Sequence, residues 1–470
     1  MASGKRTRFA PSPTGYLHLG NARTALFNYL FASAHDGAFV LRSEDTDVER
    51  SDDGLLAAMF EDLRWLGIDW SEGPDRDGPL GPYRQSERVA IYARHYERLE
   101  TLDRVYPCFC TQAELAIARR AQQAAGQAPR YAGTCRRLDA AARNARLARG
   151  DPATLRFAVD AERAVEFKDL VHGPRHFAGR DLGDFVIRRA DGSAAFLFSN
   201  ALDDALMQIT HVLRGEDHLS NTPRQLLVLE ALGLPAPRYG HMPLVLGDDG
   251  APLSKRSGSA SLRNLRAEGV LPEALCNHLA RLGHALANGA LISMKDLPAA
   301  FDIERLGRAP ARHDPTQLAH WQREAVHGAD PERLWRWMES PQLDTLVPAA
   351  QRLTFVATVQ PNLEVPSDAL AWAERLYAEP PPYSDDARAA IKEAGAEFFA
   401  TAHAAAGHAR GFKDLVDVLA METARKGRAL YHPLRAALTA ATDGPELAKV
   451  YALLGERVAS RLEAARGMAG

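Results

Sequence analysis

The chain has 470 residues, of which 46% are hydrophobic and 25% charged, and its formal net charge is −3. This length predicts two to four domains, and the composition is that of an ordinary globular protein without membrane-spanning segments. The four cysteines are too few for a disulfide framework, and the first residues lack the apolar core of a signal peptide, so we expect a cytoplasmic protein. The charge excludes a protein that is basic all over, but not a nucleic-acid partner bound on one basic face.

The first part of the chain alternates strand and helix signals. Residues 7–10 ("TRFA") predict a short strand, residues 22–34 a helix, and residues 38–47 ("AFVLRSEDTD") a strand that runs into acidic residues. This succession is typical of a parallel α/β sheet, whose ligands bind beyond the carboxyl ends of its strands. The loop after residue 10 and the segment "SEDTD" would both lie at that end.

Three further regions follow along the chain. From about Tyr106 a mixed segment predicts an inserted α+β module. The strand pattern then returns at residues 208–213 ("QITHVL") and at residues 243–246 ("PLVL"), before an Asp-Asp-Gly turn. Beyond about Ser261 the apolar spacing is helical almost throughout, with a proline-rich break from Ala378.

Two loops carry residues suited to phosphate binding. "FAPSPTGYLHLGNARTAL" leaves a strand and opens a helix, where free backbone N–H groups attract anions. In it Gly15 and Gly20 allow close backbone approach, and Thr14 and His18 can donate hydrogen bonds. The pattern is neither a P-loop nor a dinucleotide fingerprint. A histidine between leucines is, by itself, more often structural.

The second loop, "PLSKRSGS", follows a predicted strand and offers Lys255 and Arg256. A Ser-Lys-Arg loop alone is usually a solvated surface turn. Two loops of this kind, each after a strand and in this order, form a more specific pair.

At these loops the sequence resembles the class I aminoacyl-tRNA synthetases, and within them the bacterial glutamyl-tRNA synthetases. "HLGN" (residues 18–21) corresponds to the family's HIGH signature, and "PLSKR" (residues 252–256) to its KMSKS signature. The resemblance extends over nearly the whole chain through "EDTD", "RWLGIDW", "YRQSER", "DFVIRRADG", "THVLRGEDHLSNTPRQ", "KGRALYHPLRAAL" and "GPEL".

The resemblance implies an enzyme that joins glutamate to ATP and transfers the glutamyl group to the terminal adenosine of tRNA(Glu), or also of tRNA(Gln). The α-carboxylate of glutamate is already ionised, so the enzyme has to position it and stabilise charge, and Mg²⁺ accompanies the ATP. By this resemblance the phosphates are bound by Thr14, His18, Gly20, Asn21, Lys255 and Arg256, of which His18 and Lys255 are the catalytic pair.

The same resemblance implies a glutamate pocket. Two carboxylates and one ammonium call for two guanidinium groups and one carboxylate, and the implied residues are Arg8, Ser12, Glu44, Phe196, Asn200 and Arg214. Without the resemblance, a surface ion pair is the better interpretation of Arg214. Three positions depart from the family: Phe196 replaces a tyrosine that contacts glutamate, Pro252 replaces the first lysine of KMSKS, and Ser43 stands where isoleucine is common.

A structural zinc site is predicted in the inserted segment. Thiolates suit zinc, and a Cys-x-Cys pair can supply two of its four ligands. Because Arg137 stands where the family can have a histidine, the resemblance implies Cys108, Cys110, Cys135 and Tyr131. The alternative is a small core of reduced cysteines. Cys276 lies on an apolar helix face and is expected in the core.

The family also implies a domain plan and partners. We expect a monomer, with no membrane association, built from a Rossmann-like catalytic domain (residues 1–105 and 185–250), an acceptor-end-binding insertion (106–184), a stem-contact region with the Ser-Lys-Arg loop (251–322) and a helical anticodon-binding domain (323–470). Two alternatives are a truncated relative that modifies a queuosine base, which the continuation to Gly470 disfavours, and a non-catalytic tRNA-binding paralogue, which the intact motif residues disfavour.

Overall fold

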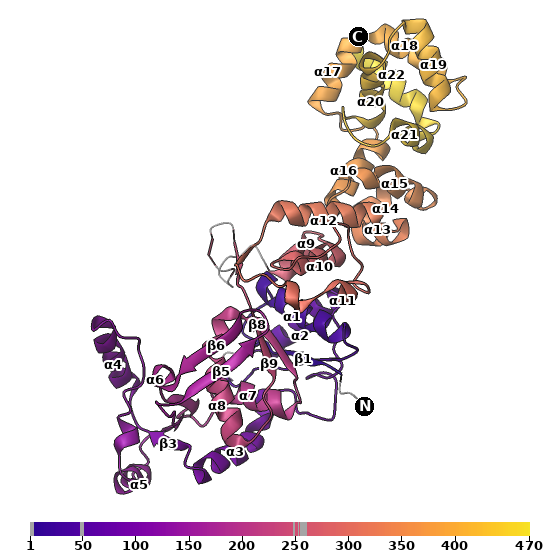
Figure 1. Ribbon diagram of the computed structural model, residues 1–470. Coiled ribbons are helices and arrows are strands. Elements are labelled where there is room, and N and C mark those ends of the chain that lie inside the picture. Colours follow the sequence, from indigo (N-terminus) through magenta and orange to yellow (C-terminus); the bar gives the residue numbers. More distant parts are fainter. Residues whose placement is uncertain (1–3, 48–50, 248–249, 252, 254–260) are drawn as a thin grey trace. The chain divides into compact units, whose positions relative to one another are not determined.

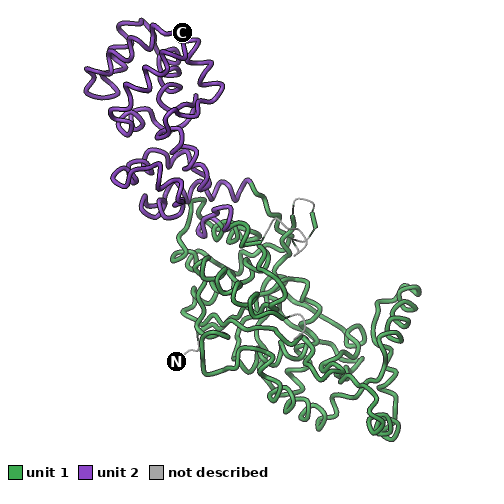
Figure 2. The backbone as a smooth tube through the Cα atoms, turned by 180° about the vertical axis from the view of Figure 1, so that it is seen from behind, with its two compact units in different colours: residues 1–265, 275–315 green, residues 266–274, 316–470 purple. Residues whose placement is uncertain are grey.

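The computed structural model describes residues 4–47, 51–247, 250–251, 253 and 261–470 (Figure 1). The chain forms two compact units, coloured separately in Figure 2. Unit 1 comprises residues 1–265 and 275–315, and unit 2 comprises residues 266–274 and 316–470. The four-domain plan expected from the sequence is finer than this division and stays a prediction.

Unit 1 begins with a parallel β–α–β arrangement, as the sequence predicts. Strand β1 (Arg6–Phe9) pairs in parallel with β2 (Ala38–Leu41), and α1 (Leu19–Ser33) connects them. The apolar residues of α1 are buried almost all round, because the helix packs against β1, β2 and a third strand, β8 (His211–Gly215). This crossover confirms the predicted Rossmann-like fold class.

A second parallel pair of strands completes the Rossmann-like part of unit 1. Strand β8 pairs with β9 (Arg238–Met242), and helices α7 (Phe196–Leu206) and α8 (Thr222–Leu232) flank it. The backbone N–H of Thr210 donates to the Arg6 carbonyl at 2.9 Å, which joins this pair to β1. Strand β8 starts three residues later than predicted, because Gln208 has φ of 55° just after α7 ends.

The segment between the two parallel pairs is mixed, as predicted. Three antiparallel strands pair in the order β3–β4–β7, and β5 and β6 form a hairpin beside β9. Helices α4 and α5 bury no residue completely. Helix α4 stands apart from the strands of the unit (Figure 1), whereas Arg143 of α5 lies over the ring of Tyr106 in β3. These elements are β3 (Val105–Cys108), α4 (Gln112–Ala124), α5 (Ala140–Ala148), β4 (Thr154–Phe157), β5 (Ala164–Asp169), β6 (Gly173–Ala178), α6 (Gly179–Leu182) and β7 (Phe185–Arg188).

The remaining elements of unit 1 are two short strands and several helices, of which α9 and α10 are divided between the two units. The predicted strand at residues 243–246 shortens to β10 (Val245–Leu246), which pairs in parallel with β11 (Ala311–Arg312) rather than with the main strands. Asp248 and Asp249 of the predicted turn lie outside the described residues. The helices here are α2 (Asp53–Trp65), α3 (Val89–Thr101), α9 (Leu262–Ala267), α10 (Pro272–Arg281) and α11 (Leu297–Ala300). Cys276 is fully buried, as expected.

From Pro315 onward the described chain is helical, as predicted. The proline-rich break falls between α16, which ends at Tyr377, and α17, which begins at Asp385. The helices are α12 (Pro315–Gly328), α13 (Pro331–Met338), α14 (Pro341–Leu346), α15 (Arg352–Val359), α16 (Pro366–Tyr377), α17 (Asp385–Ala394), α18 (Ala396–Ala406), α19 (Phe412–Thr423), α20 (Arg428–Thr439), α21 (Leu447–Leu454) and α22 (Arg457–Ala469). Among the described residues, no helix has both the length and the apolarity needed to span a bilayer.

Candidate functional site

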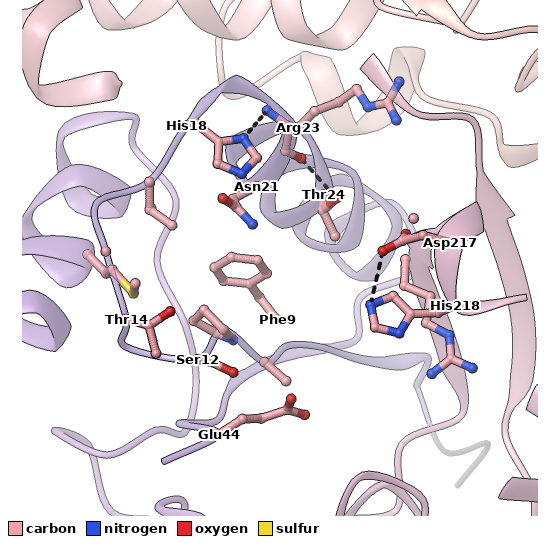
Figure 3. Close-up of a pocket in the computed structure, with 18 of the residues that line it drawn as sticks. Phe9, Ser12, Thr14, His18, Asn21, Arg23, Thr24, Glu44, Asp217 and His218 are labelled. Atoms are coloured by element: carbon pink, nitrogen blue, oxygen red, sulfur yellow. Dashed lines mark hydrogen bonds and ion pairs between the residues drawn. The ribbon is translucent and has the colours of Figure 1, made fainter. Parts of the chain in front are cut away.

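A cavity of about 670 Å³ opens at the carboxyl ends of β1, β2 and β8 (Figure 3). Each residue that the sequence assigned to this site, and that the structure describes, lines it: Arg8, Ser12, Thr14, His18, Gly20, Asn21, Glu44, Phe196, Asn200 and Arg214. The predicted residues Lys255 and Arg256, together with the departure Pro252, lie outside the described residues.

The loop after β1 and the first turn of α1 form one side of the cavity. The Thr14 N–H donates to the Ser12 carbonyl at 2.8 Å, which makes a tight turn. His18 is the N-cap of α1, and its Nδ1 accepts from the Gly20 N–H at 3.1 Å. A Cβ at residue 20 would lie 3.0 Å from the His18 ring, so a glycine fits there best. The N-terminal end of this helix favours an anion.

The two flanks of the "PLSKRSGS" loop lie at the same side. Leu253 lines the cavity, and its N–H donates to the Val245 carbonyl at 2.8 Å. Ser261 forms a β-bridge with His18, and the Leu262 N–H donates to the Leu17 carbonyl at 3.0 Å.

The opposite side of the cavity is built from buried charges. Asp204 accepts from Nε and Nη2 of Arg8 at 2.9 and 3.2 Å, and from Nη1 of Arg42 at 2.8 Å. Burial by itself raises the pKa of the Asp204 carboxyl, but the two guanidinium groups outweigh burial and hold that pKa below its usual value. Arg8 and Arg42 therefore share a carboxylate that stays ionised.

Arg214 differs from these two arginines because no carboxylate contacts it within the described parts of the chain. Its Nη2 donates to Thr222 and Gln225, both at 2.7 Å, and its Nε donates to His241 at 3.2 Å. Its Nη1 is buried and has no hydrogen-bond partner among the described residues. Burial lowers the pKa of Arg214 to about 10, so the guanidinium stays charged at pH 7. An anion beside Nη1 would supply the missing acceptor and favour the charged form further.

Glu44 is the complementary case. It follows β2, its side chain is 8% exposed, and it accepts a hydrogen bond from the Asn200 amide while lying 3.5 Å from Nη2 of Arg42. Gln225 donates to the Asn200 carbonyl oxygen at 3.0 Å and so orients this amide. Burial raises the pKa of Glu44 despite Arg42 and Asn200. A cation in the cavity beside Glu44 would favour its ionised form.

The charges at this side favour a ligand with a net negative charge. Arg8, Arg42 and Arg214 face Asp204 and Glu44, so this part of the site carries one excess positive charge. A ligand with two carboxylates and one ammonium has the opposite charge. The excess sits on Arg214, and Glu44 provides a carboxylate for the ammonium.

A second group of charged residues in the cavity was missed by the sequence analysis. His218 packs against Phe196 with ring centroids 5.2 Å apart, and its Nε2 lies 3.7 Å from the Asp217 carboxylate. Burial and Arg214 lower the pKa of His218 to about 4, so it is neutral at pH 7. Arg23 donates to the Leu282 carbonyl at 3.2 Å and to the Pro243 carbonyl, and burial lowers its pKa to about 10.

Asp204 and Arg42 were missed although a signal was present. Asp203 and Asp204 form a doublet inside the mainly apolar helix "FLFSNALDDAL", and two acids there need buried partners. Asp203 accepts hydrogen bonds from Nε of Arg88 and from the Tyr92 hydroxyl, both at 2.7 Å.

Three cysteines of the inserted segment meet at the end of β3. The sulfurs of Cys108, Cys110 and Cys135 lie within 4.8 Å of one another. The Tyr131 hydroxyl oxygen lies 3.4 Å from Sγ of Cys108 and 3.5 Å from Sγ of Cys110, and the Cys110 and Cys135 sulfurs are 3.6 Å apart. Ligand atoms of a tetrahedral zinc lie ~3.7 Å apart. The four side chains can therefore hold a metal ion.

The protonation of these groups also suits a metal. Burial raises the pKa of the Cys108 thiol, but contacts with Tyr131 and Arg156 outweigh it and lower that pKa to about 7. Burial raises the pKa of Cys110 to about 11. A cation is thus needed to keep both thiols ionised at once.

Two family profiles match the chain. "tRNA synthetases class I (E and Q), catalytic domain" matches residues 5–320, and "Anticodon binding domain" matches residues 318–466. Together they span nearly the whole chain, which confirms the resemblance found in the sequence.

Individual relatives agree with these profiles. The chain is 55% identical over 460 residues to glutamate–tRNA ligase 2 of Nitrosococcus oceani, with 97% of each chain covered. It is 53% identical over 467 residues to glutamate–tRNA ligase 1 of Halorhodospira halophila, covering 99% of this chain and 97% of that one. A crystal structure of a glutamate tRNA ligase from Elizabethkingia meningosepticum, in complex with its amino acid, has a TM-score of 0.88 at 29% identity and covers 99% of both chains. The chain therefore belongs to the glutamate–tRNA ligases, a family of class I aminoacyl-tRNA synthetases.

Proposed function

We propose that this chain activates L-glutamate with ATP to glutamyl adenylate and transfers the glutamyl group to the 3′-terminal adenosine of tRNA(Glu). One observation carries the choice of amino acid. The buried side of the cavity has one excess positive charge on Arg214, whose Nη1 lacks a partner among the described residues, and a carboxylate on Glu44. Glutamate, with two carboxylates and one ammonium, complements these groups.

In this proposal Arg8 and Arg214 bind the two carboxylates, and Glu44 binds the ammonium with Asn200 beside it. Ser12 and Phe196 complete the pocket. Arg8 keeps its orientation through Asp204, so little side-chain freedom is lost when the substrate binds. The glutamate that binds has its α-carboxylate ionised and needs no general base before it attacks the α-phosphate of ATP.

The phosphate side would then stabilise the charge that develops as pyrophosphate leaves. The end of α1 at Gly20 and Asn21, with Thr14 and His18, would hold the phosphates, and Mg²⁺ would enter with ATP and neutralise part of their charge. We assign Lys255 and Arg256 to the binding of these phosphates. The support for this is that Leu253 lines the cavity, and that Ser261 forms a β-bridge with His18, which also lines it.

ATP–pyrophosphate exchange in the presence of tRNA(Glu) tests the amino-acid assignment. Glutamate should support exchange, whereas aspartate and glutamine should not, because they misplace or lack the second carboxylate. Arg214→Ala should raise the KM for glutamate about 100-fold, since a charged hydrogen bond is lost and the cavity loses its excess charge. An unchanged KM for glutamate would refute the assignment of Arg214.

The proposed tRNA partners are tRNA(Glu) and, as a second acceptor, tRNA(Gln), which the family resemblance includes. The match to an anticodon-binding domain over residues 318–466 favours a tRNA ligase over a truncated base-modifying relative. We also propose that the enzyme works in the cytoplasm as a monomer. Aminoacylation of purified tRNA(Glu) and tRNA(Gln) transcripts measures the tRNA choice, and light scattering measures the oligomeric state.

We propose a structural zinc ion bound by Cys108, Cys110, Cys135 and Tyr131. The spacing of the three sulfurs and the hydroxyl oxygen supports it. Protein purified without chelator should contain about one zinc per chain, and Cys135→Ser should lower both zinc content and melting temperature. Zinc well below one per chain would favour the alternative, a small core of reduced cysteines.

A further inference from the structure

A chain of three fully or almost fully buried side chains runs behind the cavity and ends at Arg214. Asp169, the last residue of β5, contacts His241 on β9, with 2.6 Å between Oδ2 and Nδ1. Nε2 of His241 in turn lies 3.2 Å from Nε of Arg214. The side chains of Asp169 and His241 have no exposed surface. Neither residue lines the cavity, so each can act on a substrate only through Arg214.

The hydrogen-bond partners fix the tautomer of His241. Arg214 Nε always carries a hydrogen and can only donate, so Nε2 of His241 has to accept. Burial lowers the pKa of His241 although Asp169 opposes this, and the ring is therefore neutral at pH 7. Its one proton is on Nδ1, where it is donated to Asp169.

Asp169 is itself held in one orientation. Its Oδ1 accepts the backbone N–H groups of Val171 at 2.9 Å and His172 at 2.8 Å, and the His241 N–H lies 3.4 Å away. These three donors leave Oδ2 for the imidazole. The β5–β6 hairpin thus supplies a fixed acceptor that selects the Nδ1–H tautomer.

The tautomer of His241 determines how the guanidinium group of Arg214 is held. Its Nε is bound by His241, and its Nη2 by Thr222 and Gln225. The hydroxyl oxygen of Thr222 is also 2.9 Å from Nε2 of His241, so Thr222 contacts both Arg214 and His241. Nη1 is the one nitrogen of this guanidinium that is left, buried, without a hydrogen-bond partner among the described residues.

We propose that Asp169 and His241 are positioning residues for amino-acid binding, which hold Arg214 with Nη1 directed to the substrate carboxylate. This inference rests on the proposed function, in which Arg214 binds glutamate. It assigns a role in substrate affinity to two residues that do not touch the substrate.

Two substitutions at residue 241 distinguish loss of the hydrogen bond to Arg214 from loss of the ring volume. His241→Gln keeps an acceptor near the Nε2 position, whereas His241→Asn keeps a donor for Asp169 and loses the acceptor for Arg214. His241→Asn should raise the KM for glutamate about 10-fold, and His241→Gln should stay within about 3-fold of the wild type. For both, kcat and the KM for ATP should change less than about 3-fold.

Asp169→Asn provides a variant that keeps the shape of the buried chain. Its Oδ1 can still accept hydrogen bonds from the hairpin N–H groups, but its amide NH₂ now faces Nδ1 of His241. Nδ1 then has to accept, so the proton of His241 moves to Nε2. The Nε2–H group and the Nε–H group of Arg214 are then two donors that face each other. The KM for glutamate should again rise about 10-fold. His211→Asn is the matched control. His211 is 4% exposed and lies on β8 with Arg214, but outside the cavity.

The outcomes distinguish this inference from the function on which it rests. If Arg214→Ala raises the KM for glutamate but His241→Asn and Asp169→Asn do not, the positioning role is wrong and the pocket assignment stands. Equal effects of His241→Asn and His241→Gln would also overturn the role of the acceptor. If Arg214→Ala leaves the KM unchanged, the pocket assignment and this inference fall together.

Discussion

The two ends of the cavity are built by different means. The end around Arg214 and Glu44 consists of buried side chains that bind one another, and Arg8, Asn200 and Arg214 are each at most 5% exposed. The phosphate end consists of a loop and a helix N-terminus, and Thr14 there is exposed while His18 is half-buried. At one end the fold positions charged side chains, and at the other it positions backbone N–H groups.

This difference fits the two ligands that we propose for the two ends. A buried charge that lacks a full set of partners discriminates between ligands, because the wrong ligand leaves it unsatisfied. Phosphates are large and strongly charged, and they can be bound at a site that water also reaches. Backbone N–H groups and a cation are therefore sufficient to bind them. Substitutions at the phosphate end should therefore change the rate, and substitutions at the buried end should change the affinity for the amino acid.

The largest effect is expected for Lys255→Ala. Loss of the cation that we assign to the leaving phosphates should lower the rate of adenylate formation by about 10²–10³-fold, with the glutamate KM unchanged. Rapid-quench measurement of adenylate at saturating ATP and glutamate gives this rate. Lys295→Ala, at a residue outside the cavity, is the control. Adenylate formation at the wild-type rate would remove Lys255 from the mechanism.

Glu44→Gln should have the next largest effect and should act on affinity. Loss of the carboxylate for the ammonium raises the KM for glutamate about 10-fold or more, because a charged hydrogen bond becomes a neutral one. The free energy of unfolding should not fall, since burial raises the pKa of Glu44 and its ionised form is costly in the empty cavity. Steady-state aminoacylation and urea unfolding measure the two quantities.

Glu230→Gln is a suitable control for this substitution. Glu230 forms an exposed ion pair with Arg163 in the same unit, and its loss should change neither quantity measurably. A rate defect in Glu44→Gln without a change in KM would contradict the division of the cavity into a rate end and an affinity end.

Much of the fold and part of the site could be predicted from the sequence. The β–α–β start follows from short apolar runs around a segment of helix-forming residues, and the position of Glu44 after β2 places it at the ligand edge of any parallel sheet. The choice of Arg8 and Arg214 among many arginines needed the resemblance to a family. Local sequence gives no sign of which arginine has a carboxylate partner.

The residues that were missed depend on long-range contacts. Arg8 and Asp204 are 196 positions apart, and His241 and Asp169 are 72 apart. Neither pair produces a local pattern, because the partner is set by the sheet order and by the packing of α7 and the β5–β6 hairpin. The late start of β8 depends on the left-handed conformation of Gln208, which propensity does not predict for glutamine.

The pH dependence of stability should report the burial around β8. Burial lowers the pKa of His211 to about 4, whereas in the unfolded chain it is about 6.5. The folded state therefore binds fewer protons between these values, and stability is complete above pH 6.5 and is lost as the pH falls towards 4. The expected slope is up to about 1.4 kcal/mol per pH unit for this residue.

Urea unfolding at several pH values between 7 and 4.5 measures this slope. His211→Asn should reduce the slope by this contribution, because one of the groups that have to remain neutral is gone. His218 and His278, whose pKa values burial also lowers to about 4, keep theirs. An unchanged curve for His211→Asn would show that burial around β8 does not set the acid sensitivity.

The smallest effect is expected for Phe196→Tyr, which restores the family's hydroxyl. Phe196 begins α7, lines the cavity and packs on His218, which is neutral at pH 7. A new neutral hydrogen bond contributes about 1 kcal/mol, so the KM for glutamate should fall up to about 5-fold with kcat unchanged. Steady-state aminoacylation measures both.

A small gain is expected because, in the proposed site, each charged group of glutamate already has a charged partner at the buried end. A neutral hydroxyl can refine such a site but cannot decide its specificity. If Phe196→Tyr instead lowered the KM for glutamate by about two orders of magnitude, far more than one neutral hydrogen bond contributes, Arg8, Glu44 and Arg214 would bind glutamate weakly without the tyrosine. In that case the buried charges would set the orientation of the amino acid, and the hydroxyl would provide most of its affinity.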